Sequence, residues 1–181
     1  MSATILILPG YGDSGPGHWQ TLWERRHGYA RVVQDDWERP ALDAWKQRLD
    51  EAMARASGAV VLVAHSLGCA LVAHCATEAC AARIAGAFLV APPDVDEVCH
   101  LLPEIESFAP MPLRRLPFPA VVVGSTNDPY AEPARVRAFA AAWGARLVEL
   151  DGAGHVNVES GHGEWPEGHR LLAELLEAIR R

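Results

Sequence analysis

The chain has 181 residues, half of them apolar, which is enough for a single compact domain over residues 1–181 with a sizeable core. Its formal net charge is −7 and its arginines are scattered, so it lacks the basic face on which nucleic-acid binding depends. The four cysteines, Cys69, Cys75, Cys80 and Cys99, form no C-x-x-C pair and have no zinc-site spacing with nearby histidines, which predicts reduced, packed thiols and no metal site.

The first predicted strand spans residues 4–8 and leads into a glycine-rich loop. The strand is too short for a signal peptide, which together with the cysteine pattern favours a cytoplasmic protein. The loop contains GDSGPG at residues 12–17, one substitution away from the GDSGGP around the nucleophile of trypsin-like proteases. In those proteases the catalytic histidine precedes the serine, but no histidine precedes His18 here, so Ser14 is not the expected nucleophile. The glycines also lack the G-x-G-x-x-G spacing of a dinucleotide site, and we expect no cofactor.

Strands and helices alternate along the rest of the chain. Prolines open three predicted helices at Pro40, Pro133 and Pro166, and Gly144 closes the second of them. Strands that are apolar on both faces and alternate with helices predict an α/β fold, with a mostly parallel sheet of about six strands and helices on both faces. The further strands are expected at residues 31–34, 59–64, 86–91, 120–124 and 146–150.

Two stretches depart from a simple alternation. Residues 58–76 are nearly apolar enough to resemble a membrane span, but two histidines, a serine and a glycine interrupt them. A strand that turns sharply into a helix explains this stretch better, and we expect no membrane association. Residues 92–119 are rich in proline and are expected to form an irregular loop, which is the candidate for a small cap over a site.

Ser66 stands where the strand at residues 59–64 meets the following helix. Ala64 and Gly68 lie two residues to either side, and such small neighbours are needed where a nucleophilic serine occupies a strained strand-to-helix turn. The helix start also places partial positive charge beside a developing oxyanion. An S-x-G pattern by itself is common at turns, and Ala64 replaces the glycine of G-x-S-x-G, so the strand–turn–helix context carries the interpretation. We predict Ser66 as the nucleophile.

Asp128 and His155 each follow a later predicted strand. In isolation Asp128 is a turn residue before Pro129, and His155 is a loop residue beside glycines. Their order after Ser66, each beyond the carboxyl end of a strand at one sheet edge, favours an acid and a general base that converge on the nucleophile. Asp94, after the strand at residues 86–91, is a rival acid, and that alternative stays open.

Several longer motifs are more specific than S-x-G. They are SGPGHWQTLWE, DDWERP, AHSLG, PFPAVVVGSTNDPY and WGARLVELDGAGHVNVESGHGEWPEG. With these motifs, nearly the whole chain resembles the small serine hydrolases of the α/β-hydrolase superfamily grouped with YdeN and retinoblastoma-binding protein nine. The resemblance implies a reduced α/β-hydrolase fold with little or no cap and a triad matching Ser66, Asp128 and His155.

The same resemblance gives the loop after the first strand a role. Its sequence, PGYG, stands where superfamily members often carry His-Gly-x-Gly, which implies an oxyanion hole formed by the backbone N–H groups of Tyr11 and Leu67. His18, Trp19 and Trp37 are candidates for the pocket wall. For Trp19 the helical spacing to Trp23 favours a core position, and for His18 helix capping and pocket lining stay open.

We therefore expect a serine hydrolase that cleaves a small acyl ester through an acyl-enzyme and needs no metal or organic cofactor. An amide hydrolase or aminopeptidase that uses the same site is the alternative within enzymes. A non-catalytic protein-binding module that retains the fold is the alternative outside them. No physiological substrate or protein partner is predicted from the residues.

Overall fold

A computed structural model describes residues 3–76 and 82–180 of the chain, so that Cys80 lies outside the described residues. Its centre is a six-stranded sheet in the order β2-β1-β3-β4-β5-β6, and every neighbouring pair of strands is parallel. This confirms the predicted fold class and number of strands. The strands are β1 (Thr4–Leu8), β2 (Ala30–Arg31), β3 (Val60–His65), β4 (Ile84–Val90), β5 (Ala120–Ser125) and β6 (Arg146–Leu150).

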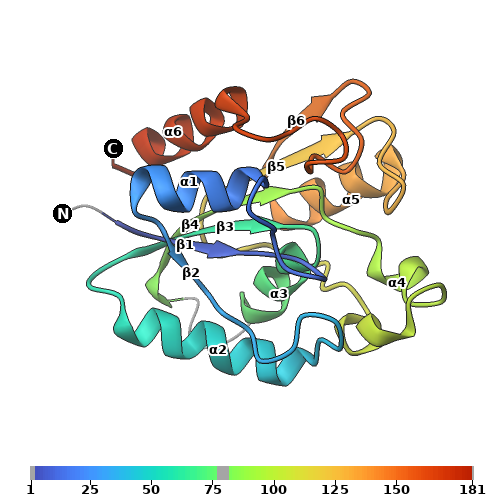
Figure 1. The fold of residues 1–181 in the computed structure, drawn as a ribbon, viewed down its shortest axis with the longest axis horizontal. Helices are drawn as coiled ribbons and strands as arrows, with labels where there is room; N and C mark the ends of the chain where they lie inside the picture. The colour runs from blue at the N-terminus through green and yellow to red at the C-terminus, as the bar shows by residue number, and fades with distance from the viewer. Residues whose placement is uncertain (1–2, 77–81, 181) are drawn as a thin grey trace.

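Helices cover both faces of the sheet, and α1 and α6 lie together on one of them (Figure 1). Alternate residues of β3 divide between the two faces, since Val61 and Val63 pack with α1 and α6 whereas Leu62 packs with the other helices. Because both faces are covered, all six residues of β3 are buried. The helices are α1 (Trp19–His27), α2 (Leu42–Arg55), α3 (Leu67–Cys75), α4 (Val95–Val98), α5 (Pro133–Trp143) and α6 (Pro166–Arg180), with a 3-10 helix, η2 (Pro103–Phe108).

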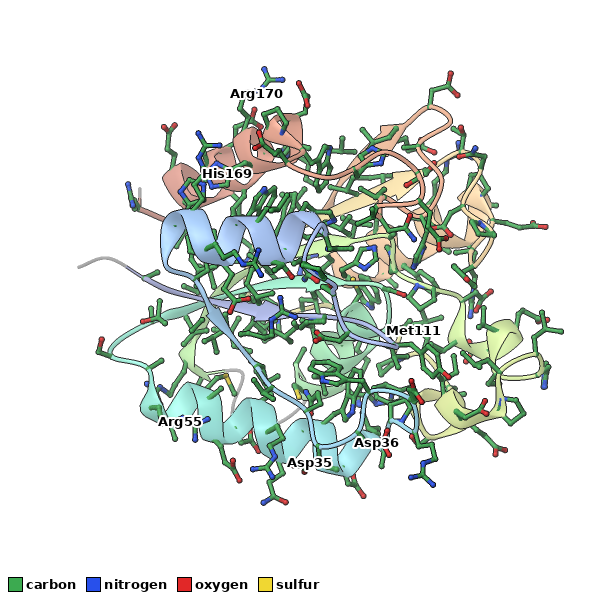
Figure 2. All side chains as sticks on the ribbon, in the orientation of Figure 1. Asp35, Asp36, Arg55, Met111, His169 and Arg170 are labelled. Atoms are coloured by element: carbon green, nitrogen blue, oxygen red, sulfur yellow. The ribbon has the colours of Figure 1, made fainter. Side chains whose placement is uncertain are left out.

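Ring contacts join α6 to α1 on the first face. His169 of α6 points toward α1 (Figure 2), and its ring stacks on that of His27 with centroids 4.2 Å apart. The Trp165 ring, just before α6, stacks on Trp23 of α1 with centroids 5.9 Å apart. None of the described helices is long and apolar enough to cross a membrane.

Two predicted boundaries were wrong. The second strand was expected at residues 31–34, but pairing with β1 ends at Arg31, because β2 is an edge strand from which the chain turns away and leaves Val33 63% exposed. Pro40 does not open α2, which begins two residues later at Leu42. The Leu42 N–H there donates to the Ser107 hydroxyl at 3.1 Å, so a distant side chain supplies the cap that local sequence does not show.

Residues 92–119 are more ordered than their composition predicts. They contain α4 and η2, which lie at the edge of the molecule beyond the right-hand end of the sheet in Figure 1. Ile105 and Phe108 of η2 are buried against the core, so this segment has packing of its own. That packing places it beside the carboxyl ends of the strands.

Candidate active site

Ser66 occupies a strained turn between β3 and α3. Its φ is 53° and its ψ is −125°, a combination that non-glycine residues rarely adopt and that surrounding structure must enforce. The Ser66 N–H donates to the Val90 carbonyl at 2.9 Å, and the Ser66 carbonyl accepts from the Cys69 N–H at 2.8 Å. The neighbouring strand β4 therefore holds the N–H of the strained residue, and the first turn of α3 holds its carbonyl.

Two glycines allow the loop after β1 to approach this turn. A Cβ at Gly10 would lie 2.7 Å from the Ser66 Cβ and 3.1 Å from the Leu67 nitrogen. A Cβ at Gly68 would lie 2.4 Å from the Leu8 carbonyl oxygen. The loop and the turn thus pack backbone against backbone, which explains the small residue at position 68 and adds Gly10, whose contact was not predicted.

Gly68→Ala is expected to destabilise the protein. The added Cβ would meet two backbone oxygens, those of Leu8 and Pro9, which cannot rotate away as a side chain would. Overpacking of this kind costs roughly 2–3 kcal/mol in the free energy of unfolding. Urea unfolding of both proteins measures the change.

Gly15→Ala is the matched control for that substitution. Gly15 lies in the same loop region, but a Cβ there would meet no atom within 4 Å. We expect the free energy of unfolding to change by no more than about 0.5 kcal/mol in this variant. Equal losses in the two variants would contradict the close-packing explanation.

His155 and Asp128 form a buried pair. The His155 Nδ1 lies 2.9 Å from Asp128 Oδ2 and 3.0 Å from Oδ1. Both side chains are more than nine-tenths buried, and Asp128 Oδ1 also accepts the Tyr130 N–H at 2.9 Å. The carboxylate therefore fixes the imidazole with its proton on Nδ1 and leaves Nε2 as an acceptor.

Hydrogen bonds between the loops after β5 and β6 bring this pair together. The Asn127 Oδ1 accepts the Gly154 N–H at 2.7 Å, and Thr126 Oγ1 accepts the Gly152 N–H at 2.9 Å. Asn127 and Gly154 are the immediate neighbours of Asp128 and His155. The pair is thus positioned by a network that spans two loops.

Asp94, the rival acid, has a different partner. Its Oδ2 accepts from the Arg135 Nε at 2.9 Å, and Arg135 also binds Asp96. Among the described residues, no hydrogen bond joins Asp94 to His155. The geometry therefore favours Asp128 as the acid.

Ser66, His155 and Leu67 line one pocket of about 530 Å³. One part of its wall is apolar and comes mainly from the α4–η2 segment, with Val98, Leu101, Leu102 and Ile105. Another part is polar and comes from the loops after β1 and β6. The lining residues of that polar part are Tyr11, Asp13, His18, Asn157 and Glu159.

The two predicted oxyanion donors lie at this pocket. Leu67 is the first residue of α3, where a backbone N–H has no acceptor within the helix. Tyr11 follows Gly10 in the loop that packs against the turn. Among the described residues, no side chain or backbone group accepts a hydrogen bond from the Tyr11 or Leu67 N–H, and the Ser66 hydroxyl has no partner either.

The other predicted pocket residues divide into two groups. Trp19 and Trp37 do not line this pocket, so the candidate role of Trp37 as pocket wall was wrong, whereas Trp19 takes the core position that its helical spacing favoured. Trp19 is fully buried, and its Nε1 donates to the Val156 carbonyl at 2.9 Å, which makes it a core residue that anchors the loop carrying His155. Trp37 packs edge-on against Trp45, with ring centroids 5.5 Å apart.

His18 does line the pocket, and it also caps α1. The two alternatives left open by the sequence therefore both hold. Burial lowers the pKa of His18 to about 4, and the Arg31 guanidinium and His155 add to that effect. His65, which also lines the pocket, donates from Nε2 to the His155 carbonyl at 2.8 Å, and its burial holds its pKa well below the usual value.

Ser14 is also part of the support for this region. Its hydroxyl donates to Gln20 Oε1 at 2.7 Å, and Gln20 Nε2 donates to the carbonyls of Leu8 and Val63 at 3.1 Å each. The buried Gln20 thus ties the loop to the ends of β1 and β3. Ser14 serves as a structural residue of the loop and not as a nucleophile.

Sequence reasoning missed several residues of the pocket. Tyr130 packs edge-on against His155 with ring centroids 4.6 Å apart, and it belongs to the Asn-Asp-Pro-Tyr motif. Asn157 belongs to the Gly-His-x-Asn motif. Both motifs drew attention to these residues without assigning them a position. For the apolar wall from α4 and η2, the only signal in the sequence was the proline-rich composition of residues 92–119, which indicated a possible cap.

Comparisons with known proteins agree with this architecture. A family model described as serine hydrolase matches residues 5–174. A YdeN-like hydrolase from Pectobacterium atrosepticum is 31% identical with a TM-score of 0.86, over 98% of this chain and 92% of that one. The ydeN gene product of B. subtilis is 18% identical with a TM-score of 0.76, over 97% of this chain and 100% of that one. A propionate-bound esterase from Thermogutta terrifontis is 18% identical with a TM-score of 0.69, over 98% of this chain and 83% of that one. No curated protein matches the chain.

Proposed function

Because the chain belongs to the serine hydrolase family of small YdeN-like α/β hydrolases, we propose that it cleaves small acyl esters through an acyl-enzyme on Ser66. The observation that carries this proposal is the buried His155–Asp128 pair, whose histidine lines the same pocket as a serine on a strained turn. A serine, a base and an acid that orients the base are the parts that acyl transfer requires.

In the proposed first step, His155 Nε2 takes the Ser66 hydroxyl proton as the oxygen attacks the ester carbonyl. Asp128 keeps the other imidazole proton on Nδ1 and stabilises the imidazolium that forms. The imidazolium then gives its proton to the alkoxy oxygen, and the alcohol leaves from the acyl-enzyme. Water repeats these steps on the acyl-enzyme, releases the acid and restores the Ser66 hydroxyl.

The backbone N–H groups of Tyr11 and Leu67 are the proposed donors to the oxyanion. Support comes from their place at the pocket and from the lack of any acceptor for either group among the described residues. Loss of one such donor raises the barrier by about 3 kcal/mol in acyl-transfer sites. The close approach of Gly10 to the turn is what brings the two donors near one another.

Esters are favoured over amides as substrates. The Thermogutta terrifontis protein is named an esterase and has been solved with propionate bound, so short acyl esters are the first substrates to test. The apolar α4–η2 wall bounds this pocket of about 530 Å³ and would contact an apolar arm of the ester.

The test is a series of 4-nitrophenyl esters from acetate to decanoate, measured beside aminoacyl 4-nitroanilides on the purified protein. We expect the highest kcat/KM for a short acyl ester, as the propionate bound to the Thermogutta terrifontis esterase suggests, and little turnover of the anilides. Turnover of the anilides alone would replace the esterase with an amide hydrolase. No turnover and no labelling by a fluorophosphonate probe would indicate a non-catalytic binding module.

A further inference from the structure

His18 lines the pocket that contains Ser66, and its ring carries a buried Nε2–H that no described residue uses. Only 6% of the residue is exposed, and it lines the pocket beside His65. The rings of His18 and His65 meet edge-on with centroids 4.7 Å apart. The proposed hydrolytic mechanism makes no use of His18.

The tautomer of His18 follows from its role as the cap of α1. The Gln20 backbone N–H donates to His18 Nδ1 at 3.2 Å. A backbone N–H can only donate, so Nδ1 carries no proton and the single proton of the neutral ring is on Nε2. The pKa of about 4 that burial imposes on His18 keeps the ring in this neutral form at physiological pH.

The Nε2–H of His18 has no acceptor among the described residues, although the atom is buried. Buried donors in native proteins nearly always have a partner, and an unpaired one costs free energy. The neighbouring His65 differs in this respect, since its Nε2 is paired with the His155 carbonyl. The unpaired donor is therefore a candidate partner for a polar atom of a bound molecule.

We propose that His18 Nε2–H donates a hydrogen bond to a second oxygen of the ester substrate, apart from the reacting carbonyl group. The inference rests on the proposed esterase function and adds a substrate class to it. The substrate would be an ester with an apolar arm and an arm that carries an ether, hydroxyl or carbonyl oxygen. The apolar arm would contact the α4–η2 wall, and the oxygen-bearing arm would contact the loop that carries His18.

Pairs of esters of the same shape test this proposal, because each pair exchanges one CH₂ group for an oxygen. Methyl methoxyacetate and methyl butanoate place the exchange in the acyl arm. 2-Methoxyethyl acetate and butyl acetate place it in the alcohol arm. Hydrolysis of each ester is measured by pH-stat titration. For each pair we compare the ratio of kcat/KM for the oxygen-containing ester to kcat/KM for the hydrocarbon ester.

His18→Asn is the informative variant, because asparagine is a good helix cap but its short side chain has no donor where Nε2 lies. We expect the ratio for one of the two arms to fall about tenfold from the natural protein to His18→Asn, the size of one hydrogen bond. His18→Phe removes the same donor while filling the ring position, and the same fall is expected. The arm whose ratio changes tells which side of the scissile bond carries the second oxygen.

His27→Asn is the matched control, since His27 is an exposed histidine at the other end of α1. We expect both ratios to be unchanged in that variant. If the kcat/KM ratios of both ester pairs are the same in the natural protein and in both His18 variants, the proposal is overturned. Ester hydrolysis and probe labelling of Ser66 would in that case still support the proposed function. Absence of ester hydrolysis would overturn the proposed function first.

A measurement without turnover uses Ser66→Ala protein labelled with ¹⁵N in histidine. The free protein should show His18 with a protonated Nε2 and an unprotonated Nδ1. The oxygen-containing ester of the affected arm should shift the Nε2–H resonance downfield, and the hydrocarbon ester of the same pair should not. Equal responses to the two esters would contradict a hydrogen bond from His18.

Discussion

Ser66→Ala is expected to lower kcat for short 4-nitrophenyl esters on the order of 10⁶-fold and to abolish labelling by a fluorophosphonate probe. The hydroxyl is the atom that forms the acyl-enzyme in the proposed mechanism, so no other group of the pocket can replace it. Binding should survive, because Tyr11, His18 and the apolar wall are unaffected. Single-turnover kinetics measure the loss of ester hydrolysis, and intact-mass measurement after treatment with the probe measures the loss of labelling.

Ser66→Gly separates the chemistry from the strain of the turn. It removes the same hydroxyl, but glycine adopts a φ of 53° without the cost that serine bears there. We expect this variant to be as inactive as Ser66→Ala and more stable than it by about 1 kcal/mol. Labelling that persists in either variant would move the nucleophile to another residue.

The sheet and the turn at Ser66 could be predicted because their determinants are local. A buried strand in a parallel sheet is apolar on both faces, and the runs before Ser66 and Asp128 show this directly, whereas the strand before His155 is the edge strand β6, which exposes Arg146 and Glu149. The order of strands also places the ends of β3, β5 and β6 at one edge. Three residues that each follow one of these strands are therefore brought near one another by topology alone.

What could not be predicted depends on contacts between distant segments. Trp37 follows a strand in the sequence, yet it packs on Trp45, because β2 ends early and the chain then turns toward α2. Nothing local showed that the Ser107 hydroxyl would serve the start of α2. The position of His18 at the pocket likewise depends on distant contacts, because the buried Gln20 of α1 binds the backbone of β1 and β3.

Asp128→Asn is expected to lower kcat/KM roughly 10⁴-fold while the protein remains folded. The Asp128 carboxylate accepts the His155 Nδ1 proton through two oxygens at 2.9 and 3.0 Å. An asparagine amide can donate to Nδ1 instead, which moves the imidazole proton to Nε2 and removes the base that Ser66 needs. The asparagine Oδ1 can still accept the Tyr130 N–H, so the loop should keep its conformation. Ester hydrolysis at neutral pH and urea unfolding measure the two effects.

Asp94→Asn should give the opposite result, and the comparison decides which residue is the acid. Asp94 binds Arg135 between the α4 and α5 segments, so its substitution removes a charge-assisted hydrogen bond worth about 1–3 kcal/mol of folding stability. Because no hydrogen bond joins Asp94 to His155 among the described residues, kcat/KM should change less than about tenfold, the effect of 1.4 kcal/mol on a barrier. The acid would be Asp94 if activity survived Asp128→Asn and was lost in Asp94→Asn. Activity lost in Asp128→Asn and stability lost in Asp94→Asn would assign the catalytic role to the first and a structural role to the second.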